Sequence, residues 1–206
     1  MNRFFILSVL VMLLAGCAAS PPLPQDHIYV FSAPKEPGDG RVSLTGKTVA
    51  VAAFKSAGLY SERPILFRNN LQTNELQQYH YHYWSMPPGQ AMQEVLIAAL
   101  RIQAPNALVT DASVASVADL QIGGKIWNFE QREQGDSQSV HLKIEFEVKH
   151  PQSIKPIFLR TYELDKRQAE SGVESAVATF DIAVQEIMEN FLRDLPLLLN
   201  GSSMVK

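Results

Sequence analysis

The stretch Val-His-Leu-Lys-Ile-Glu-Phe-Glu-Val-Lys, residues 140–149, decides the fold class of this 206-residue chain. Apolar side chains alternate with polar or charged ones along it, and this is the period of a β-strand, whose successive side chains point to opposite faces of a sheet. One face of this strand is therefore expected to be buried, and the other to be charged and in contact with water. A sheet with one apolar face needs a second layer of structure to cover that face.

Two segments with helical periodicity can supply that layer. Pro87-Pro88 suits the first turn of a helix, where a missing N–H costs nothing, and Pro105 ends the segment. A second helix is expected over about residues 172–195, where Ser171 and Glu174 fit a capping box. Each segment carries one apolar stripe at helical spacing. The two stripes are Ala91, Met92, Val95, Leu96, Ala99 and Ile102, and Val173, Val177, Phe180, Val184, Ile187, Met188, Phe191 and Leu195.

The remaining apolar runs predict further strands, which are separated by turn residues. These runs are Ile28–Phe31, Thr48–Phe54, Pro64–Arg68, Leu76–Trp84, Ala118–Glu130 and Ile157–Tyr162. Gly123-Gly124, inside the longest run, predicts either a β-bulge or a close backbone approach, and residues 33–46 predict a loop. We therefore expect an α+β fold, with a mostly antiparallel sheet and two amphipathic helices packed on one face.

The N-terminus has the features of a bacterial lipoprotein signal. Arg3 and the apolar run Phe4–Leu14 precede small residues, as in a secretory signal, and the run is too short to span a bilayer. Leu14-Ala15-Gly16-Cys17 resembles the lipobox, at which the Cys thiol takes a diacylglycerol and the signal is cut between Gly16 and Cys17. The alternatives are an ordinary signal peptide with an incidental cysteine, and a buried apolar N-terminal helix. Cys17 is the only cysteine, which favours the lipobox and leaves no disulfide.

The composition divides the chain into four parts. Residues 1–16 are expected to be the lipoprotein signal peptide, and residues 17–27 the lipidated cysteine with a flexible proline-rich tether. Residues 28–199 form the domain, and residues 200–206 a flexible tail. The apolar segment Leu195–Leu199 could dock on a partner or a membrane, although we favour its folding back onto the core.

The sequence offers little for catalysis or metal binding. His80 and His82, in the aromatic run 79–84, could supply two ligands of a metal site, but no third or fourth ligand lies at a recognisable spacing. We favour a strand with three tyrosines on one face and two solvated histidines on the other. Glu145 and Glu147 share the charged face of their strand with lysines, which is typical of cross-strand salt bridges. No nucleophile elbow or phosphate loop is present in the sequence. The net charge is −3, and no stripe of basic residues is visible that could bind nucleic acid. We therefore expect no enzyme, metal site, cofactor or nucleic-acid partner.

Aromatic residues are the candidates for contact with a ligand or partner, although aromatics in such positions often pack in a core. The candidates are Tyr79, Tyr81, Tyr83, Trp84, Trp127 and Phe129. The last two, Trp127 and Phe129, are expected to share one face of their strand. Edge strands also invite pairing between chains, so a homo-oligomer is an open expectation.

Three features together resemble one family. They are the lipobox, the segment Tyr60–Arg68, and the segment Leu76–Pro88, in which an aromatic-rich strand leads into Pro-Pro. On these features the chain is identified as a member of the ABC-type transport auxiliary lipoproteins, the PqiC-like family, over roughly residues 28–195. The family's usual Tyr-Tyr-apolar-Leu start is replaced here by His27–Phe31.

The resemblance implies a non-catalytic partner of an ABC transporter, with its permease and ATPase, that carries an MCE-domain substrate-binding protein. Such systems move phospholipids or related hydrophobic molecules between the inner and outer membranes. Ala18 stands where an aspartate would favour retention in the inner membrane, so the expected location is the periplasmic face of the outer membrane. The alternatives are a structural envelope lipoprotein or outer-membrane barrel assembly factor, and an envelope hydrolase.

Overall fold

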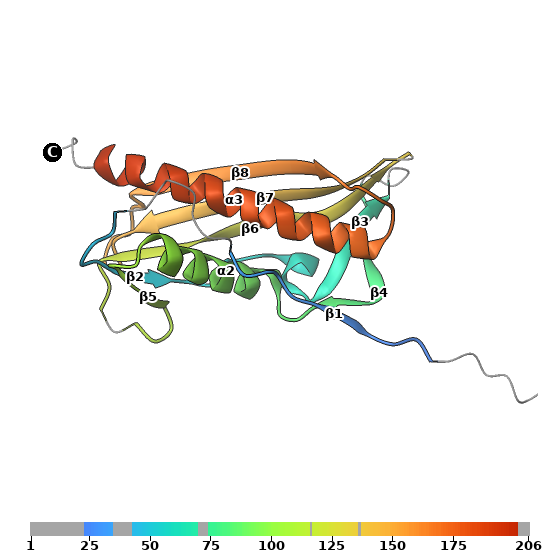
Figure 1. Ribbon diagram of the computed structural model, residues 1–206, viewed down its shortest axis with the longest axis horizontal. Coiled ribbons are helices and arrows are strands. Elements are labelled where there is room, and N and C mark those ends of the chain that lie inside the picture. Colours follow the sequence, from blue (N-terminus) through green and yellow to red (C-terminus); the bar gives the residue numbers. More distant parts are fainter. Residues whose placement is uncertain (1–22, 35–42, 70–73, 116, 136, 202–206) are drawn as a thin grey trace, which may run out of the picture.

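The computed structural model describes residues 23–34, 43–69, 74–115, 117–135 and 137–201. The predicted signal peptide, Cys17, most of the tether and the chain from residue 202 lie outside these ranges. The described residues form one eight-stranded sheet with helices beside it (Figure 1). The strands are β1 (His27–Tyr29), β2 (Thr48–Val51), β3 (Pro64–Asn69), β4 (Gln77–Trp84), β5 (Leu108–Asp111), β6 (Leu120–Gln134), β7 (Ser137–Lys149) and β8 (Phe158–Arg167). The helices are the 3-10 helix η1 (Gly58–Ser61) and the α-helices α2 (Pro88–Gln103) and α3 (Val173–Gly201). Within the described ranges, no helix combines the length and the apolar character needed to span a bilayer.

The three longest strands form an antiparallel meander, in which β6 pairs with β7 and β7 with β8. Two groups of short strands share the other edge of β6. β2 pairs in parallel with the start of β6 and with β5. β3 pairs in parallel with the end of β6, and β4 and β1 follow it. The predicted α+β class is confirmed, and the sheet is mixed, with both parallel and antiparallel pairs. Parallel strands need a crossover connection, and the connection between the parallel strands β2 and β5 includes α2.

The alternation in residues 140–149 is confirmed for the apolar face, whereas on the charged face His141 is buried and the other residues are only partly exposed. The apolar residues of this stretch of β7 are fully buried, and they are Val140, Leu142, Ile144, Phe146 and Val148. α3 packs over β7 and β8, while α2 packs over β2, β5 and β6. Both helices therefore cover one face of the sheet, as predicted (Figure 1).

The ends of α3 differ from the prediction. The helix begins at Val173, so Gly172 rather than Ser171 holds the N-cap position, and Gly172 has a φ of 109° that suits glycine. The predicted capping box is therefore wrong, because it needs a side-chain oxygen at the N-cap and Gly172 has none. At the other end, α3 continues past Leu195 and through Pro196, because the leucines that follow are strong helix formers. The side chains after Pro196 lie outside the described part, and so does their predicted return to the core.

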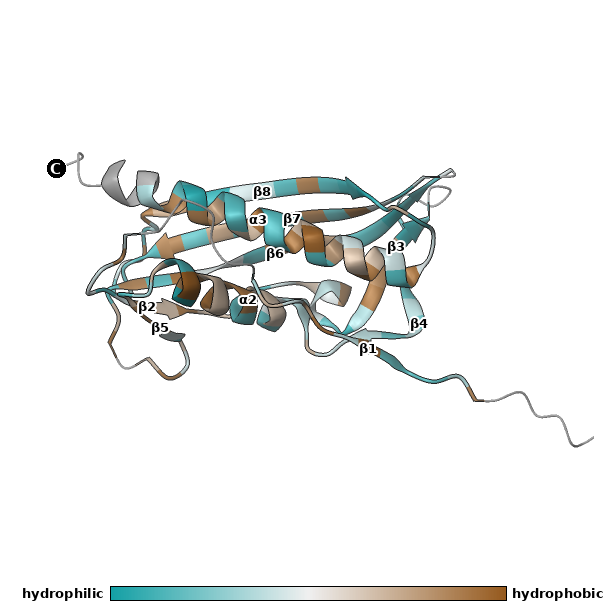
Figure 2. Cartoon of the chain, in the orientation of Figure 1, coloured by the Kyte–Doolittle hydropathy of each residue, from teal (hydrophilic) through white to brown (hydrophobic). Residues whose placement is uncertain are grey.

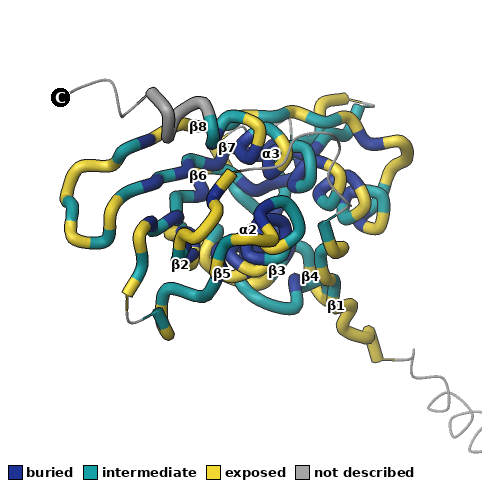
Figure 3. The backbone as a smooth tube through the Cα atoms, turned by 60° about the vertical axis from the view of Figure 1, so that its left-hand side comes forward, coloured by how far each residue is buried: buried dark blue, intermediate teal, exposed yellow. Residues whose placement is uncertain are grey.

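An aromatic core fills the space between the sheet and the helices. Trp84 meets Phe129 edge-on, with ring centroids 5.8 Å apart, and Phe129 stacks on Phe180 of α3 at 4.9 Å. Phe146 of β7 stacks on Phe191 of α3 at 4.2 Å. Apolar residues recur along α2 and α3 in Figure 2, and Figure 3 shows the buried segments gathered where these helices approach β6 and β7. This core holds α3 on the meander.

Gly124 confirms the predicted close backbone approach. A β-carbon at this position would lie 1.9 Å from the carbonyl oxygen of Glu145 and 2.7 Å from the ring of Phe54. A β-carbon at Gly89, in the first turn of α2, would lie 2.1 Å from the carbonyl oxygen of Phe54. At Gly123 the nearest atom would be 3.4 Å away, which is an ordinary contact. Phe54 is therefore held between α2 and β6 by two glycines that leave no room for a side chain.

A β-bulge also occurs in β6, but at Trp127. Ile126 and Asn128 pair with consecutive residues of β7, so Trp127 is the extra residue. The side chain of Trp127 is 44% exposed, whereas Phe129 is buried. The predicted shared face of Trp127 and Phe129 is therefore wrong, because the bulge shifts the alternation by one residue.

β4 departs from simple alternation as well. Its register with β3 shifts between Pro64 and Leu66, and Tyr81 has a φ of 66°. The rings of Tyr79 and His82 lie 6.0 Å apart and contact each other edge-on. The predicted separation of tyrosines and histidines onto opposite faces is therefore wrong, because it assumed an unbroken strand.

Candidate functional site

The face of the sheet that the helices leave open carries a row of polar side chains across β3, β6, β7 and β8. The strand register aligns Glu130 of β6 with His141 of β7, and His141 with Asp165 of β8. Arg132, two residues after Glu130 and on the same face, pairs with Arg68 of β3. Register therefore brings together groups that are far apart in sequence.

Glu130 lies at the centre of this polar row, and its carboxylate is fully buried. Its Oε1 accepts hydrogen bonds from Nε of Arg68 at 2.7 Å and from Nε of Arg132 at 3.1 Å. Its Oε2 accepts a hydrogen bond from the Tyr60 hydroxyl. Burial alone would raise the pKa of Glu130, but these three hydrogen bonds outweigh burial and hold the pKa below its usual value. Glu130 is therefore an ionised group with its acceptors engaged.

The short helix η1 places Tyr60 over the polar row. The Tyr60 hydroxyl accepts hydrogen bonds from Nη2 of Arg68 at 3.4 Å and from Nδ2 of Asn128 at 3.2 Å. Burial raises the pKa of Tyr60, and the hydrogen bond to Glu130 adds to this rise. The hydroxyl therefore stays protonated and serves Glu130 as a permanent donor.

The other half of the polar row joins β7 to β8. His141 Nδ1 lies 2.9 Å from Oδ1 of Asp165, and His141 Nε2 lies 3.7 Å from Oε1 of Glu163. Lys143 forms a 2.8 Å salt bridge with Glu163 across the two strands. Nη1 of Arg132 lies 3.8 Å from Asp165. These contacts connect the ionisable side chains of β3, β6, β7 and β8 into one network on the open face.

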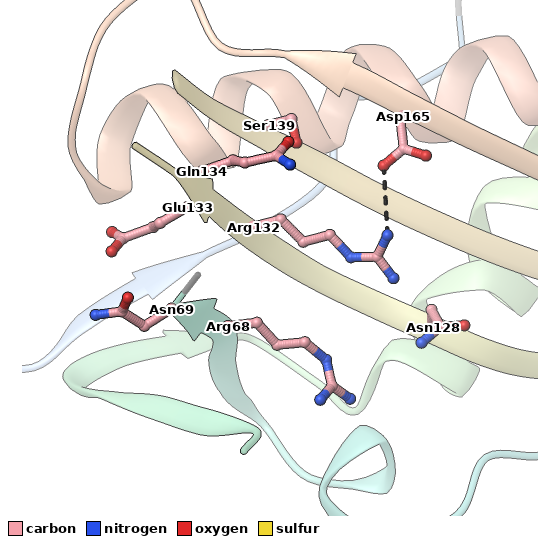
Figure 4. Close-up of a pocket in the computed structure, with 8 residues that line it drawn as sticks. All are labelled: Arg68, Asn69, Asn128, Arg132, Glu133, Gln134, Ser139 and Asp165. Atoms are coloured by element: carbon pink, nitrogen blue, oxygen red, sulfur yellow. Dashed lines mark ion pairs between the residues drawn. The ribbon is translucent and has the colours of Figure 1, made fainter. Parts of the chain in front are cut away.

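A hollow of about 610 Å³ opens beside the polar row (Figure 4). Its lining residues are Arg68, Asn69, Asn128, Arg132, Glu133, Gln134, Ser139 and Asp165. Figure 4 shows the guanidinium groups of Arg68 and Arg132 extending from neighbouring strands, with Asp165 beside Arg132. Guanidinium groups bind carboxylate and phosphate in a fixed fork geometry. The hollow therefore offers cationic donors and anionic acceptors side by side, which suits a polar or zwitterionic group.

Three of the six predicted contact residues point inward. Trp84 and Phe129 are each 2% exposed and belong to the aromatic core. Tyr79 is half-buried, and its hydroxyl donates a 2.6 Å hydrogen bond to Oε1 of Gln131. Burial, with a smaller contribution from the negative charge of Glu133, raises the pKa of Tyr79 to about 12.

The other three predicted contact residues reach the surface to different extents. Tyr83 is half-buried, whereas Tyr81 and Trp127 are each 44% exposed. Nζ of Lys125 lies 3.2 Å from the centre of a Trp127 ring, which is a cation–π contact. Tyr81 and Trp127 are therefore the predicted residues with most surface to offer, and they lie on different strands.

The histidines of β4 find partners other than each other. The ring of His82 stacks on His27 of β1 at 4.8 Å, and its Nδ1 lies 2.9 Å from the Tyr29 hydroxyl. His80 is exposed. In the part of the chain that the structure describes, no three His, Cys, Asp or Glu residues form a group that could hold a metal ion.

The salt bridges predicted for the charged face of β7 are present in part. Lys143 bridges across the strands to Glu163, as noted above, whereas Glu147 bridges along its own strand to Lys149 at 3.7 Å. Glu145 lines a second, smaller hollow of about 300 Å³ near the start of β6. The charged face of β7 is therefore tied mainly to β8.

The centre of the polar row is not among the residues predicted from the sequence. Glu130 is the last residue of the predicted strand Ala118–Glu130, and a charged residue at the end of an apolar run is the only local signal there. Tyr60 and Arg68 both lie in the segment 60–68 that carries the family resemblance. Their convergence on Glu130 depends on the pairing of β3 with β6, which no local pattern reveals.

Comparison with known proteins adds a family and a fold. A family model described as the ABC-type transport auxiliary lipoprotein component matches residues 29–190. Among curated proteins, none matches this sequence. The chain is similar to the crystal structure of protein XCC0632 from Xanthomonas campestris, with a TM-score of 0.75 and 15% identity over 87% of this chain and 99% of that one. It is also similar to the crystal structure of an uncharacterized protein, with a TM-score of 0.66 and 14% identity over 84% of this chain and 99% of that one. At these identities the two structures show a shared fold only.

Proposed function

This chain belongs to the family of ABC-type transport auxiliary lipoproteins, and from that membership we propose that it is a lipid-anchored, non-catalytic accessory subunit of an ABC transporter that works with an MCE-domain protein. The proposed cargo is a phospholipid or another hydrophobic molecule that moves between the inner and outer membranes. The family match over residues 29–190 carries the proposal, because it includes nearly every described strand and most of both α-helices.

We place the anchor on Cys17 and the domain on the periplasmic face of the outer membrane. The lipobox around Cys17 and the absence of a second cysteine in the sequence support the anchor. Ala18 supports the outer membrane, since it offers no aspartate to retain the protein in the inner membrane. One acyl chain gives only reversible attachment, so the two or three chains of a lipoprotein are needed for a stable anchor.

The chemistry of the open face supports a binding role over a catalytic one. A general acid or base works best with a pKa near the operating pH and with a proton to give or take. Glu130 has the opposite character, because its pKa is lowered and three donors hold its carboxylate. A network of this kind stiffens a surface that a partner can recognise.

Crosslinking followed by isolation of the full-length, lipidated chain from cells tests this proposal. We expect an MCE-domain protein and the permease and ATPase of an ABC transporter to be recovered with it. The Cys17→Ser variant is the control, because it cannot be lipidated and should lose these partners. Recovery of an outer-membrane barrel protein in their place would contradict the proposal and select the assembly-factor alternative.

Trp127 is the residue we propose for the partner contact. The β6 bulge presents it to water on the open face, and tryptophan is one of the residues enriched at interface hot spots. We expect Trp127→Ala to weaken partner recovery by about 2 kcal/mol in binding free energy, while thermal unfolding is nearly unchanged. Val114→Ala, at a position that is 74% exposed in the loop after β5, is the matched control. Equal recovery of partners by both variants would rule out this contact.

A further inference from the structure

The first described segment after the proposed anchor carries exposed apolar residues that are not part of the hydrophobic core. Leu23 is 88% exposed, Ile28 of β1 is 60% exposed, and Val30 is 70% exposed. Tyr81, on β4 beside the residue that pairs with His27, is 44% exposed. These four residues, Leu23, Ile28, Val30 and Tyr81, are the β1 edge patch. β1, which Figure 1 draws in blue, pairs with β4, so the segment that follows the tether lies beside the strand that carries Tyr81.

The inner side of this segment is fixed to the domain. Tyr29 reaches His82 through its hydroxyl, as described above, and Phe31 stacks on Trp84 at 4.6 Å. The backbone N–H of Ser32 donates a 2.8 Å hydrogen bond to Oδ1 of Asp181 on α3. Alternation then places Ile28 and Val30 on the side away from these contacts. The exposure of Ile28 and Val30 is therefore a fixed feature of a docked strand.

Tyr81 adds an independent observation. Its φ of 66° is in the left-handed region, which a bulky aromatic residue seldom adopts. Such a backbone carries a conformational cost and persists where the surrounding structure enforces it. Here it accompanies the register shift of β4 and leaves a tyrosine ring at the surface. Tyrosine is enriched at membrane interfaces, because its ring is apolar and its hydroxyl can remain in water.

We propose that the β1 edge patch lies on the lipid bilayer that holds Cys17, so that the domain is docked on the membrane and does not move freely on its tether. The proposal rests on the lipid anchor of the proposed function. Leu23 follows Cys17 by six residues and Ile28 by eleven, so an extended chain keeps them within about 20 Å and 40 Å of the anchor. Leu23 lies in the tether itself, where a bilayer can reach it most directly. Aliphatic residues together with tyrosine suit the boundary between headgroups and acyl chains.

A single fluorescent probe on the mature, lipidated chain tests this docking. Cys17 is the only native cysteine, and lipidation uses its thiol, so an introduced cysteine is the one site that a thiol-reactive dye can label. Val30→Cys places an environment-sensitive dye in the patch. Ile154→Cys, at a 97% exposed position in the turn between β7 and β8 at the opposite end of the fold, is the control. Both positions are on the surface, so neither change should unfold the domain.

In vesicles of phosphatidylethanolamine and phosphatidylglycerol, we expect the Val30→Cys probe to shift to shorter emission wavelength and to lose fluorescence when the lipids carry a nitroxide. The Ile154→Cys probe should show neither effect. Equal emission and equal quenching for the two probes would overturn the proposal. A blue shift of the Val30→Cys probe that disappears on dilution, without quenching by the lipid nitroxide, would overturn the proposal in favour of contact with a second copy of the chain.

The anchor and the docking can fail separately. Labelling of the parent chain, without an added cysteine, would reveal a free Cys17 thiol and would overturn both the anchor and the docking. An unlabelled parent chain together with a solvent-exposed Val30→Cys probe would overturn the docking alone, and the proposed transport role would stand on the recovery of its partners.

Discussion

Replacing Gly124 with alanine is expected to destabilise the domain by about 3 kcal/mol or more, which is the upper end of the cost of overpacking. The added β-carbon would meet the backbone of β7 at Glu145 O, 1.9 Å away, and the buried ring of Phe54, 2.7 Å away. Backbone cannot turn aside as a flexible side chain does, so β6 and β7 would have to separate at the centre of the meander. Urea unfolding of the mature chain in mild detergent, followed by circular dichroism, measures the loss.

Gly123→Ala is the matched control for this change. Both glycines lie in the interior of β6, but a β-carbon at Gly123 would have its nearest neighbour at 3.4 Å. We expect this variant to keep the stability of the parent within about 0.5 kcal/mol. If Gly124→Ala unfolded at the same urea concentration as Gly123→Ala, the packing of Phe54 between α2 and β6 would be contradicted.

Glu130→Gln is expected to cost about 2–3 kcal/mol of unfolding free energy, somewhat less than the loss of a partner from a fully buried ion pair. The amide would leave Arg68 and Arg132 without the carboxylate that both now bind through Nε. The two arginine side chains are 24% and 39% exposed, so water offsets part of the loss. Glu94→Gln, on the exposed side of α2, is the control and should unfold like the parent.

The same substitution should also change how stability depends on pH. The folded chain holds the pKa of Glu130 below the ordinary value of 4.5, so its contribution is fully present above that pH and is lost as the pH falls through the lowered pKa. When the pH is lowered from 7 to below 4.5, the unfolding free energy of the parent should therefore fall by more than that of Glu130→Gln. Parallel curves for the two proteins would show that Glu130 is not held as an ion.

The fold class could be predicted because its signals are local. Residues 140–149 alternate without a break, and the two helical stripes lie between turn-forming prolines and glycines. β5, in contrast, was not predicted, since its four residues include Thr110 and Asp111 and are too few to show a period. β5 forms because Leu108–Asp111 pair in parallel with β2. This pairing depends on the tertiary fold, so no local pattern in the sequence reveals it.

The polar row and the surface aromatics escaped prediction for a related reason. An alternation rule assigns each residue of a strand to a face, but one extra residue at Trp127 reverses the faces after it, and Tyr81 marks a similar break in β4. Simple alternation therefore places Trp127 and Phe129 on one face, although Trp127 is exposed and Phe129 is buried. Glu130 lies three residues after the bulge at Trp127, and its burial and hydrogen bonds depend on residues of the neighbouring strands and η1.

Reconstituted lipid transfer tests the central proposal most directly. Vesicles that contain the ABC transporter with its MCE-domain partner donate labelled phospholipid, and the mature lipoprotein is anchored in the acceptor vesicles. Transfer should be faster with this lipoprotein than without it, should fall to the basal rate with Cys17→Ser, and should leave the phospholipid chemically unchanged. The same transfer rate with and without the lipoprotein would contradict an accessory transport role, and hydrolysis of the lipid would contradict a non-catalytic one.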